Sequence, residues 1–334
     1  MLTIRFTLRL LTMLTIILGA SVIAEAQATR TWVSGLGDDF NPCSRTAPCK
    51  TFSGAQPNTA VNGEINCLDP GGYGSITIVK SLTIDCEDTQ GSIIASNTSG
   101  ILINLTTTLA NDPISTVRIR GLSINGVGSC GTGCGTATGT RGIQVSSGNS
   151  RAVKLFVDEV FIQNFINEGI FFNGPGGDLT VRDSLITNVI GTGVNSGAGI
   201  RALSTISGQT GGVHVTVTRT TVNYCTQGIR LEGNTTGTIT NSVASNNSLN
   251  GIVVFPQTLG NADVNITDST ASDNRQFGVF AGGVGFTGTA RIFNLTAFSN
   301  TTLQLEVSAG GAILSNTRNH IGTPTDAPGP FTDQ

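Results

Sequence analysis

Residues 239–252 show the repeating pattern from which the fold can be predicted: Ile239-Thr240-Asn241-Ser242-Val243-Ala244-Ser245-Asn246-Asn247-Ser248-Leu249-Asn250-Gly251-Ile252. The segment begins with a β-branched residue, a polar residue, a turn former and a small residue. An asparagine follows seven residues after the start, and a Gly-Ile pair about five residues later. Short runs in which apolar and polar residues alternate lie around these markers, and alternation predicts strands with one buried face.

The same pattern recurs along the second half of the chain, with successive starts 22 to 36 residues apart. The starts are Val157, Val181, Val217, Ile239, Ile266 and Ile292, and the residues seven positions later are Asn164, Asn188, Tyr224, Asn246, Asp273 and Ser299. Glycine followed by Ile or Val recurs at positions 142, 169, 199, 228, 251 and 278. A two-sheet sandwich is the alternative fold. It does not require the β-branched start, the turn residue seven positions later and the Gly-Ile pair to recur in the same order over five periods.

A period of about 24 residues, with several short strands and no amphipathic helix, predicts a β-solenoid. One coil cannot bury its own apolar face, whereas stacked coils share a continuous interior. The recurring asparagine tolerates left-handed backbone geometry, and its amide can bond the asparagine one coil away. We therefore predict an all-β protein, a parallel β-helix of about 10–12 coils that forms a single elongated domain.

The composition is weakly acidic and rich in glycine. The 334 residues include 18 Lys and Arg against 21 Asp and Glu, which gives a formal net charge of −3. Charged residues make up 12% of the chain, about half the usual share. This balance excludes a strongly basic nucleic-acid-binding protein. The hydrophobic content of 38% is high enough for a packed core and excludes a disordered chain.

The N-terminus has the pattern of a secretory signal peptide. Arg5 and Arg9 precede an apolar run over residues 10–23, and Ala24-Glu25-Ala26 places small residues where a signal peptidase cleaves. A transmembrane helix is the alternative, but the run is shorter than the roughly 20 residues that span a bilayer. We predict a signal peptide over 1–26, an N-terminal strand and cap over 27–62, the β-helix over 63–322 and a flexible tail over 323–334. The mature chain would be secreted or periplasmic, without a transmembrane anchor.

Export places the seven cysteines in an oxidising compartment, where they can pair. Cys43 and Cys49 bracket a proline-containing loop, and Cys130 and Cys134 can close a short glycine-rich ring. Cys67 and Cys86 lie in two similar segments that, as neighbouring parallel strands, bring their Cα atoms about 4.8 Å apart. Cys225 remains as a small buried residue. No histidine accompanies any cysteine pair, which argues against a zinc site.

The repeats resemble those of right-handed parallel β-helix proteins of the pectin-lyase-like superfamily. Residues 32–42 (WVSGLGDDFNP) and 47–52 (APCKTF) resemble the N-terminal segment of secreted bacterial members, in which a strand and loop lead to a short capping helix. The resemblance implies the right-handed twist of the coil. It does not imply one activity, because the superfamily includes pectin and pectate lyases, polygalacturonases, tailspikes and non-enzymatic surface proteins.

Enzymes of this fold act on the outer wall of the coil, and the residue after each Gly-Ile pair points outward there. That column includes Phe171, Arg201 and Arg230, with Glu232 two positions after Arg230. We predict these four as ligand-binding residues that can hold an acidic sugar. The alternative is that the arginines are solvated on a polar wall without a binding role. One carboxylate is too few for a glycosidase, which needs two.

A second cluster of charged residues is predicted at a turn, where Glu159, Asp183 and Arg219 align on three successive coils. They are the candidate catalytic residues if the protein is an enzyme, and only a lyase would need Ca²⁺ at this position. The alternative is a structural ladder of ion pairs, with Asp158 opposite Arg182 and Asp183 opposite Arg219. We favour the ladder, because alternating charges on stacked strands satisfy one another. We expect no metal and no other cofactor.

The sequence therefore predicts an exported β-helix, without catalysis, that presents a wall of Thr, Ser and Asn to a polysaccharide or cell-surface glycan. The alternative is a polysaccharide lyase or glycoside hydrolase that acts on acidic polysaccharides. Nucleic acid is not an expected partner.

Overall fold

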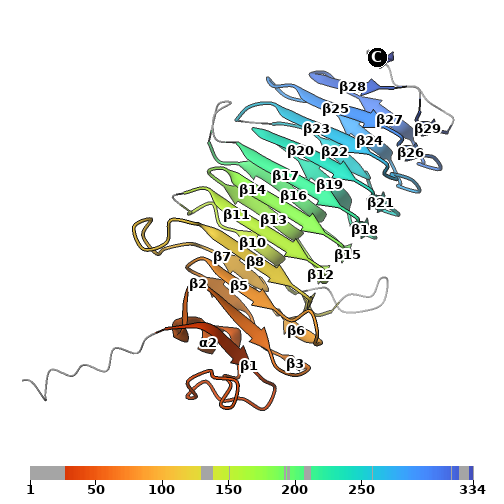
Figure 1. Ribbon diagram of the computed structural model, residues 1–334. Helices are drawn as coiled ribbons and strands as arrows, with labels where there is room; N and C mark the ends of the chain where they lie inside the picture. The colour runs from red at the N-terminus through yellow and green to blue at the C-terminus, as the bar shows by residue number, and fades with distance from the viewer. Residues whose placement is uncertain are drawn as a thin grey trace, which may run out of the picture.

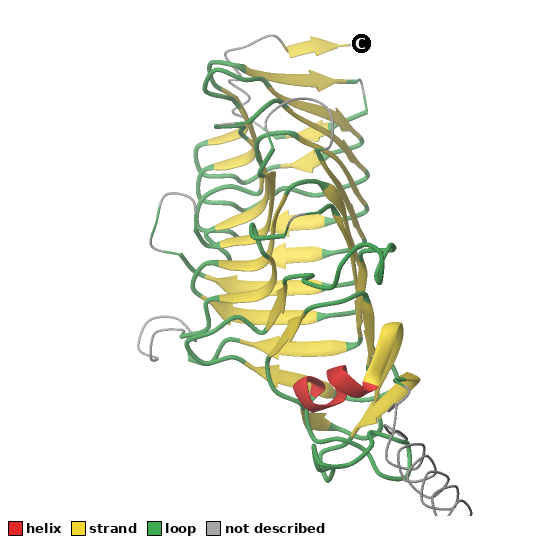
Figure 2. Ribbon diagram, turned by 90° about the vertical axis from the view of Figure 1, so that its left-hand side faces the viewer, coloured by secondary structure: helices red, strands yellow, loops and turns green. Residues whose placement is uncertain are grey.

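The computed structural model describes residues 27–128, 138–149, 151–191, 193, 196–206, 212–257, 259–316, 318–322 and 331–333. The chain winds into one tall stack of coils, with the N-terminal segment at one end and the C-terminal strands at the other (Figures 1 and 2). Each full coil contributes one strand to each of three faces, which we call sheets A, B and C. The predicted parallel β-helix is confirmed.

The strands within each face pair in parallel, each with its equivalents in neighbouring coils. Sheet A is formed, among the described residues, by β1 (Ala28–Val33), β2 (Thr59–Cys67), β5 (Leu82–Asp85), β8 (Thr116–Arg120), β11 (Val153–Asp158), β14 (Gly177–Arg182), β17 (Val213–Thr218), β20 (Thr235–Thr240), β23 (Ala262–Thr267), β25 (Gly288–Phe293), β28 (Gly311–Ser315) and β30 (Phe331–Asp333). Sheet B is formed by β3 (Gly71–Gly72), β6 (Gly91–Ile94), β9 (Leu122–Asn125), β12 (Phe161–Phe165), β15 (Leu185–Val189), β18 (Thr221–Asn223) and β21 (Val243–Ser245). The short pair β26 (Thr296–Ala297) and β29 (His320–Ile321) continues this face.

Sheet C carries the Gly-Ile pairs, which lie at or near the start of their strands. The strands of sheet C are β4 (Ile76–Ile78), β7 (Ile101–Ile103), β10 (Arg141–Val145), β13 (Glu168–Gly174), β16 (Ala198–Ser204), β19 (Gln227–Leu231), β22 (Ile252–Val254), β24 (Phe277–Ala281) and β27 (Leu303–Val307). The isoleucines of five of these strands are in register and almost completely buried: Ile143, Ile170, Ile200, Ile229 and Ile252. The shared dry interior that the repeats predict is therefore present.

Two columns of left-handed residues turn the chain from one sheet to the next. At the turn from sheet B to sheet C, the six positions predicted from the repeat have φ between 52° and 64°: Asn164, Asn188, Tyr224, Asn246, Asp273 and Ser299. At the turn from sheet A to sheet B, the equivalent φ values are 46° to 52° at Glu159, Asp183, Arg219, Asn241, Asp268 and Asn294. Asn and Asp adopt this geometry more readily than other non-glycine residues, which explains their recurrence.

Asparagine amides also link successive coils, as predicted, but in two separate ladders. In the outer ladder, Asn188 donates to Asn164 at 2.5 Å and Asn164 donates to Asn125 at 3.0 Å. A buried ladder, which the sequence interpretation missed, runs one residue further along the turn. There Asn247 donates to the Asn274 side chain at 3.0 Å, and Asn274 donates to the Asn300 side chain at 2.9 Å.

The first coil is closed by a short helix, α2 (Phe52–Asn58), where the resemblance implies a capping helix. The hydroxyl of Thr51 accepts a hydrogen bond from the Gly54 backbone N–H at 2.9 Å, which caps the helix N-terminus. The carboxylate of Asp39 in turn accepts from the Thr51 hydroxyl and backbone N–H, at 2.9 and 2.8 Å. Phe52 is fully buried, so the helix shields the apolar interior from water.

Two of the three predicted disulfides are present. Cys43 pairs with Cys49, and Cys67 pairs with Cys86 across β2 and β5 with a Cα–Cα distance of 4.9 Å. Cys130 and Cys134 lie outside the described residues. Cys225 is a free, fully buried thiol, as predicted, and burial raises its pKa to about 12. The predicted signal peptide also lies outside the described residues, as do all residues of the predicted tail except 331–333.

A buried carboxylate, Asp112, fixes the loop between β7 and β8 to the stack. It accepts hydrogen bonds from the Ser81 backbone N–H at 2.7 Å and the Ser81 hydroxyl at 2.6 Å, and it pairs with Arg151 at 2.9 Å. Burial alone raises the pKa of Asp112, but the hydrogen bonds from Ser81 and Ser115 and the charge of Arg151 outweigh it. The pKa of Asp112 in the folded protein therefore lies below the ordinary value of 3.8.

This depressed pKa predicts a specific loss of stability in acid. The stabilisation by the Asp112 carboxylate is complete above its ordinary pKa and is lost as the pH falls through the lower folded-state pKa. We expect Asp112→Asn to lower the urea midpoint at neutral pH and to reduce the further drop between about pH 5 and pH 2. Urea titrations of both proteins over this range measure the difference. Equal acid-induced drops in the two proteins would show that Asp112 is not responsible.

Candidate functional site

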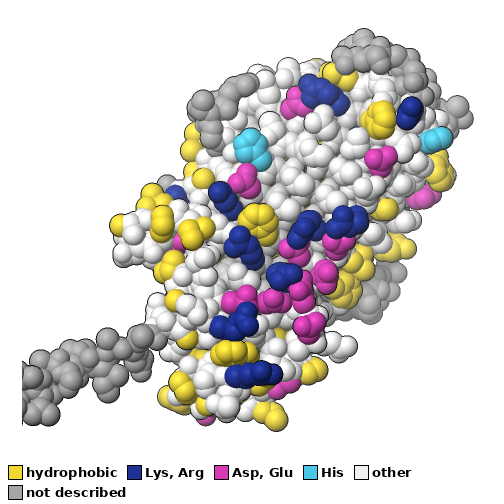
Figure 3. All heavy atoms as spheres, in the orientation of Figure 1, with side chains coloured by type: hydrophobic (Ala, Val, Ile, Leu, Met, Phe, Trp, Pro, Cys, Tyr) yellow, Lys and Arg dark blue, Asp and Glu magenta, His cyan; other side chains and the backbone are white. Residues whose placement is uncertain are grey.

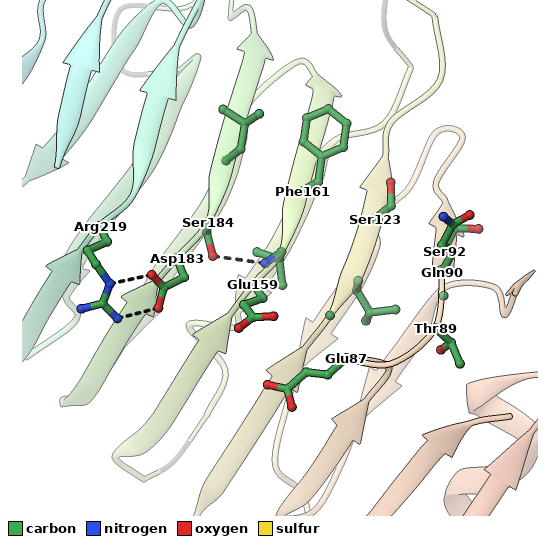
Figure 4. Close-up of a pocket in the computed structure, with 15 residues that line it drawn as sticks. Glu87, Thr89, Gln90, Ser92, Ser123, Glu159, Phe161, Asp183, Ser184 and Arg219 are labelled. Carbon is green, nitrogen blue, oxygen red and sulfur yellow. Dashed lines mark hydrogen bonds and ion pairs between the residues drawn. The ribbon is translucent and has the colours of Figure 1, made fainter. Parts of the chain in front are cut away.

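An open groove of about 970 Å³ lies at the turn between sheets A and B (Figure 4). We call it the turn groove. The charged residues that line it are Glu87, Glu159, Asp183 and Arg219. The uncharged polar residues include Gln90, Ser92 and Ser123, and the apolar residues include Phe161 and Leu185. All three candidate catalytic residues thus lie in one groove, on successive coils, as the repeat alignment predicts.

A glycine that lines the groove interrupts the column of side chains at this turn. Gly121 occupies the turn position in the coil before Glu159 and has φ +65°. A Cβ there would lie 2.5 Å from the backbone of Glu87, so no other residue fits without moving the chain. Gly121 thus leaves this turn without a side chain in the coil between those of Glu87 and Glu159.

Most of the charged side chains in and beside the groove form ion pairs. Arg219 forms two hydrogen bonds with the Asp183 carboxylate, both at 2.6 Å, and Arg182 pairs with Asp158 at 2.6 Å. These are the two pairs of the predicted ladder, which is confirmed. Arg120 pairs with Asp85 at 3.1 Å and with Glu87 at 2.5 Å. Glu159 is exposed and makes no ion pair with any described residue.

The pKa values of two groove carboxylates move in opposite directions. Hydrogen bonds from Arg219 hold the pKa of Asp183 below its ordinary value. Partial desolvation raises the pKa of Glu87, and the negative charges of Asp85, Glu159 and Asp158 add to this rise against the opposing charge of Arg120. Among the lining residues, three carboxylates lie in the groove with one guanidinium group, that of Arg219.

The four predicted ligand-binding residues lie together on sheet C. The register places Phe171, Arg201 and Arg230 side by side on β13, β16 and β19, as predicted. Arg201 bridges two carboxylates, with 3.1 Å to Glu168 and 2.9 Å to Glu232. Arg230 also pairs with Glu232, and Arg141 pairs with Glu168 at 2.6 Å. We call these five charged residues the sheet C network.

This network is buried, so the expectation that its arginines are solvated is wrong. The side chains of Arg230 and Glu232 are each 6% exposed, that of Arg201 is 15% exposed, and that of Glu168 is 1% exposed. The Phe171 ring lies 4.8 Å from the Arg141 guanidinium carbon and 5.2 Å from that of Arg201. The aromatic contacts and two carboxylates keep the guanidinium groups out of water. Whether they bind a ligand stays a prediction.

Sequence reasoning missed Glu168 and Arg141, which complete the network. Both residues directly precede a Gly-Ile pair, whereas the predicted binding column consists of residues that come after such pairs. Their parallel register, Arg141 opposite Glu168, is the signal that was available. With Glu168 and Arg141 added, the network holds three cations and two carboxylates.

The outer wall of sheet A carries ion pairs along the stack and a region rich in threonine. In the lower half of Figure 3, Lys and Arg side chains lie beside Asp and Glu side chains. Further up the stack the outward columns are rich in threonine, with Thr216 opposite Thr238 and Thr218 opposite Thr240, which is opposite Thr267. The polar wall predicted from the repeats therefore corresponds to β17, β20 and β23.

The described residues contain no cluster of three or more His, Cys, Asp or Glu side chains placed to hold a metal ion. None of their helices is long and apolar enough to cross a bilayer.

A family model for the right-handed beta helix region matches residues 141–323, which is more than half of the chain. The chain belongs to the right-handed beta helix family. Its coil therefore has the handedness that the sequence resemblance implies. No curated protein matches the chain at a significant level.

Solved structures of other β-helix proteins share the fold over most of the chain. A rhamnogalacturonan lyase is 12% identical with a TM-score of 0.59, and the match covers 89% of this chain and 83% of that one. An alginate lyase from Paenibacillus sp. str. FPU-7 is 13% identical with a TM-score of 0.55, covering 90% and 97%. The pectate lyase Pel9A is 15% identical with a TM-score of 0.51, covering 92% and 82%. At these identities the likeness extends to the fold alone.

Proposed function

We propose that this protein is an exported β-helix that binds a polysaccharide chain in the turn groove without cleaving it. The observation that carries the proposal is the mixed lining of that groove. The Phe161 ring and the Leu185 side chain, which is 37% exposed, lie among the polar groups of Gln90, Ser92 and Ser123. An apolar surface with a few hydrogen-bonding groups is typical of small-molecule and saccharide-sized binding sites.

The charge of the groove favours an uncharged glycan. Glu159 carries a negative charge without an ion pair to any described residue, so a polyanion would meet repulsion at short range. A neutral sugar can use the same carboxylate as a hydrogen-bond acceptor for its hydroxyls. This reasoning separates the proposed ligand from the acidic polysaccharides named for the pectate and alginate lyases of the same fold.

The absence of cleavage is inferred from how the charges are paired. Asp183 is neutralised by Arg219 and Glu87 by Arg120, which leaves Glu159 as the lining carboxylate without an ion pair among the described residues. A glycosidase needs two cooperating carboxylates, one as acid and the other as base or nucleophile. The two disulfides at the N-terminal end support export, because such bonds persist in oxidising compartments.

Removing the Phe161 ring tests the binding site. We expect Phe161→Ala to weaken binding of a hexasaccharide of 1,4-linked glucose at least about tenfold, because a central aromatic side chain often contributes 2 kcal/mol or more. Isothermal titration calorimetry measures the affinity. Phe293→Ala is the matched control, since Phe293 is 38% exposed on β25, outside the groove, and should leave binding unchanged. Equal affinity in all three proteins would remove the turn groove from consideration.

The second candidate function is a polysaccharide lyase or hydrolase, favoured by the position of Glu159, Asp183 and Arg219 in one groove. Under that reading, Glu159→Ala and Asp183→Ala abolish product formation from an acidic polysaccharide, with a Ca²⁺ requirement for a lyase. Under the binding proposal, no product forms with either variant or with the unaltered protein, whether or not calcium is added.

A further inference from the structure

Tyr224 is the exception in the turn column between sheets B and C. The neighbouring positions in the column hold Asn188 and Asn246, and Tyr224 shares their left-handed geometry with φ 52°. A bulky side chain is a conformational outlier there, whereas asparagine is tolerated. Tyrosine also lacks the amide that continues the outer asparagine ladder from Asn164 to Asn188.

Burial does not compensate for this conformation, because Tyr224 is 60% exposed. The other tyrosine, Tyr73, is fully buried and hydrogen-bonded to Asp69. A residue held in an unfavourable backbone region without a packing gain is more often found at functional sites than elsewhere. The position of Tyr224 is therefore better explained by what its ring presents to solvent than by the stability of the fold.

The ring lines a pocket of about 490 Å³ on this edge of the stack. The exposed side chain of Ile190 adds to its apolar surface, and Asn188, Asn246, Asp273 and Arg275 add amide, carboxylate and guanidinium groups. Asp273 and Arg275 are exposed, and neither forms an ion pair with a described residue. The pocket thus combines one aromatic surface with hydrogen-bond donors and acceptors of both charges, within the size range of small-ligand sites.

We propose that the Tyr224 pocket is a second glycan-binding site, which takes a single pyranose unit. The face of an aromatic ring carries partial negative charge and attracts the weakly positive C–H groups on one face of a sugar ring. Tyrosine offers this surface with little loss of side-chain entropy. Asp273 accepts hydrogen bonds from sugar hydroxyls, and Arg275 donates to sugar oxygens.

The pocket is separate from the turn groove. The turn groove follows the junction of sheets A and B, the pocket follows the junction of sheets B and C, and the two share no lining residue. The second site can therefore exist whether or not the turn groove binds a glycan.

Replacing Tyr224 by the residue typical of its column tests the proposal. The probes are hexasaccharides of 1,4-linked glucose, N-acetylglucosamine and galacturonic acid, titrated by calorimetry into the Phe161→Ala variant to remove the contribution of the turn groove. We expect Tyr224→Asn in that background to bind at least one probe at least about tenfold more weakly and to raise the thermal midpoint by about 2 °C, since the left-handed conformation is relieved. Tyr224→Phe keeps the ring and should bind within about threefold of the parent, without the rise in midpoint.

For Tyr224→Asn we expect a higher thermal midpoint together with weaker glycan binding. A tyrosine with a purely structural role would not give this combination. Two outcomes overturn the proposal: none of the three probes binds while Tyr224 is present, or Tyr224→Asn binds every probe as tightly as its parent. Loss of turn-groove binding in the Phe161→Ala protein leaves this comparison intact, so the two proposals fail separately.

Discussion

Glu168→Gln should lower the free energy of unfolding by about 3 kcal/mol, because it leaves buried guanidinium groups without one of their carboxylates. Glu168 is 1% exposed and pairs with Arg141 at 2.6 Å and Arg201 at 3.1 Å. The amide that replaces it keeps the shape but not the charge. Arg201 retains Glu232, whereas Arg141 has no other ion pair among the described residues.

Urea denaturation followed by circular dichroism measures this change, and Asp263→Asn is the matched control. Asp263 also pairs with an arginine on the neighbouring strand, Arg291, but their side chains are 39% and 45% exposed. Exposed pairs contribute about 1 kcal/mol or less. A loss at Glu168 as small as that at Asp263 would show that the sheet C network is solvated and free to act on a ligand.

Asn274→Ala should cost about 3 kcal/mol or more, since it leaves several buried groups of the inner asparagine ladder unsatisfied. The Asn274 side-chain oxygen accepts from the backbone N–H and from the side-chain amide of Asn247, both at 3.0 Å. Its own amide donates to the Ala244 carbonyl at 3.1 Å. Each unsatisfied buried group costs about 1–3 kcal/mol.

Asn246→Gly is the control for this prediction. Asn246 is exposed in the outer column with φ 59°, and glycine accepts that conformation without strain. We expect a change within about 0.5 kcal/mol. Hydrogen exchange should show the Asn274→Ala loss concentrated in β21 and β24, which adjoin the ladder, because each coil contacts only its neighbours. Uniform loss of protection along the stack would contradict a ladder that acts locally.

The fold could be predicted from the sequence because each coil repeats the same local requirements. A left-handed turn favours Asn or Asp, and the strand after Gly-Ile buries alternate residues, so both features remain visible at positions such as Asn246 and Ile252. The spacing of Cys67 and Cys86 was equally informative, because the strand separation fixes the distance between paired positions.

The candidate sites were harder to predict, because they depend on side-chain partners and on interruptions of the repeat. Arg201 and Arg230 were placed correctly, but their burial depends on Glu168, which precedes the Gly-Ile marker. The turn groove lies beside Gly121, where the column of side chains is interrupted. Tyr224 occupies an asparagine position, and its meaning emerges only from its exposure and its neighbours in space.

If the turn groove holds a glycan without breaking it, prolonged incubation followed by product analysis will find the sugar chains uncut. The unaltered protein is incubated at high concentration with hexasaccharides of 1,4-linked glucose and of galacturonic acid, with and without calcium. Mass spectrometry then measures the masses of the recovered oligosaccharides. We expect the glucose hexasaccharide to bind and every chain to be recovered at full length. Shortened or unsaturated products that disappear in the Glu159→Ala variant would contradict this expectation.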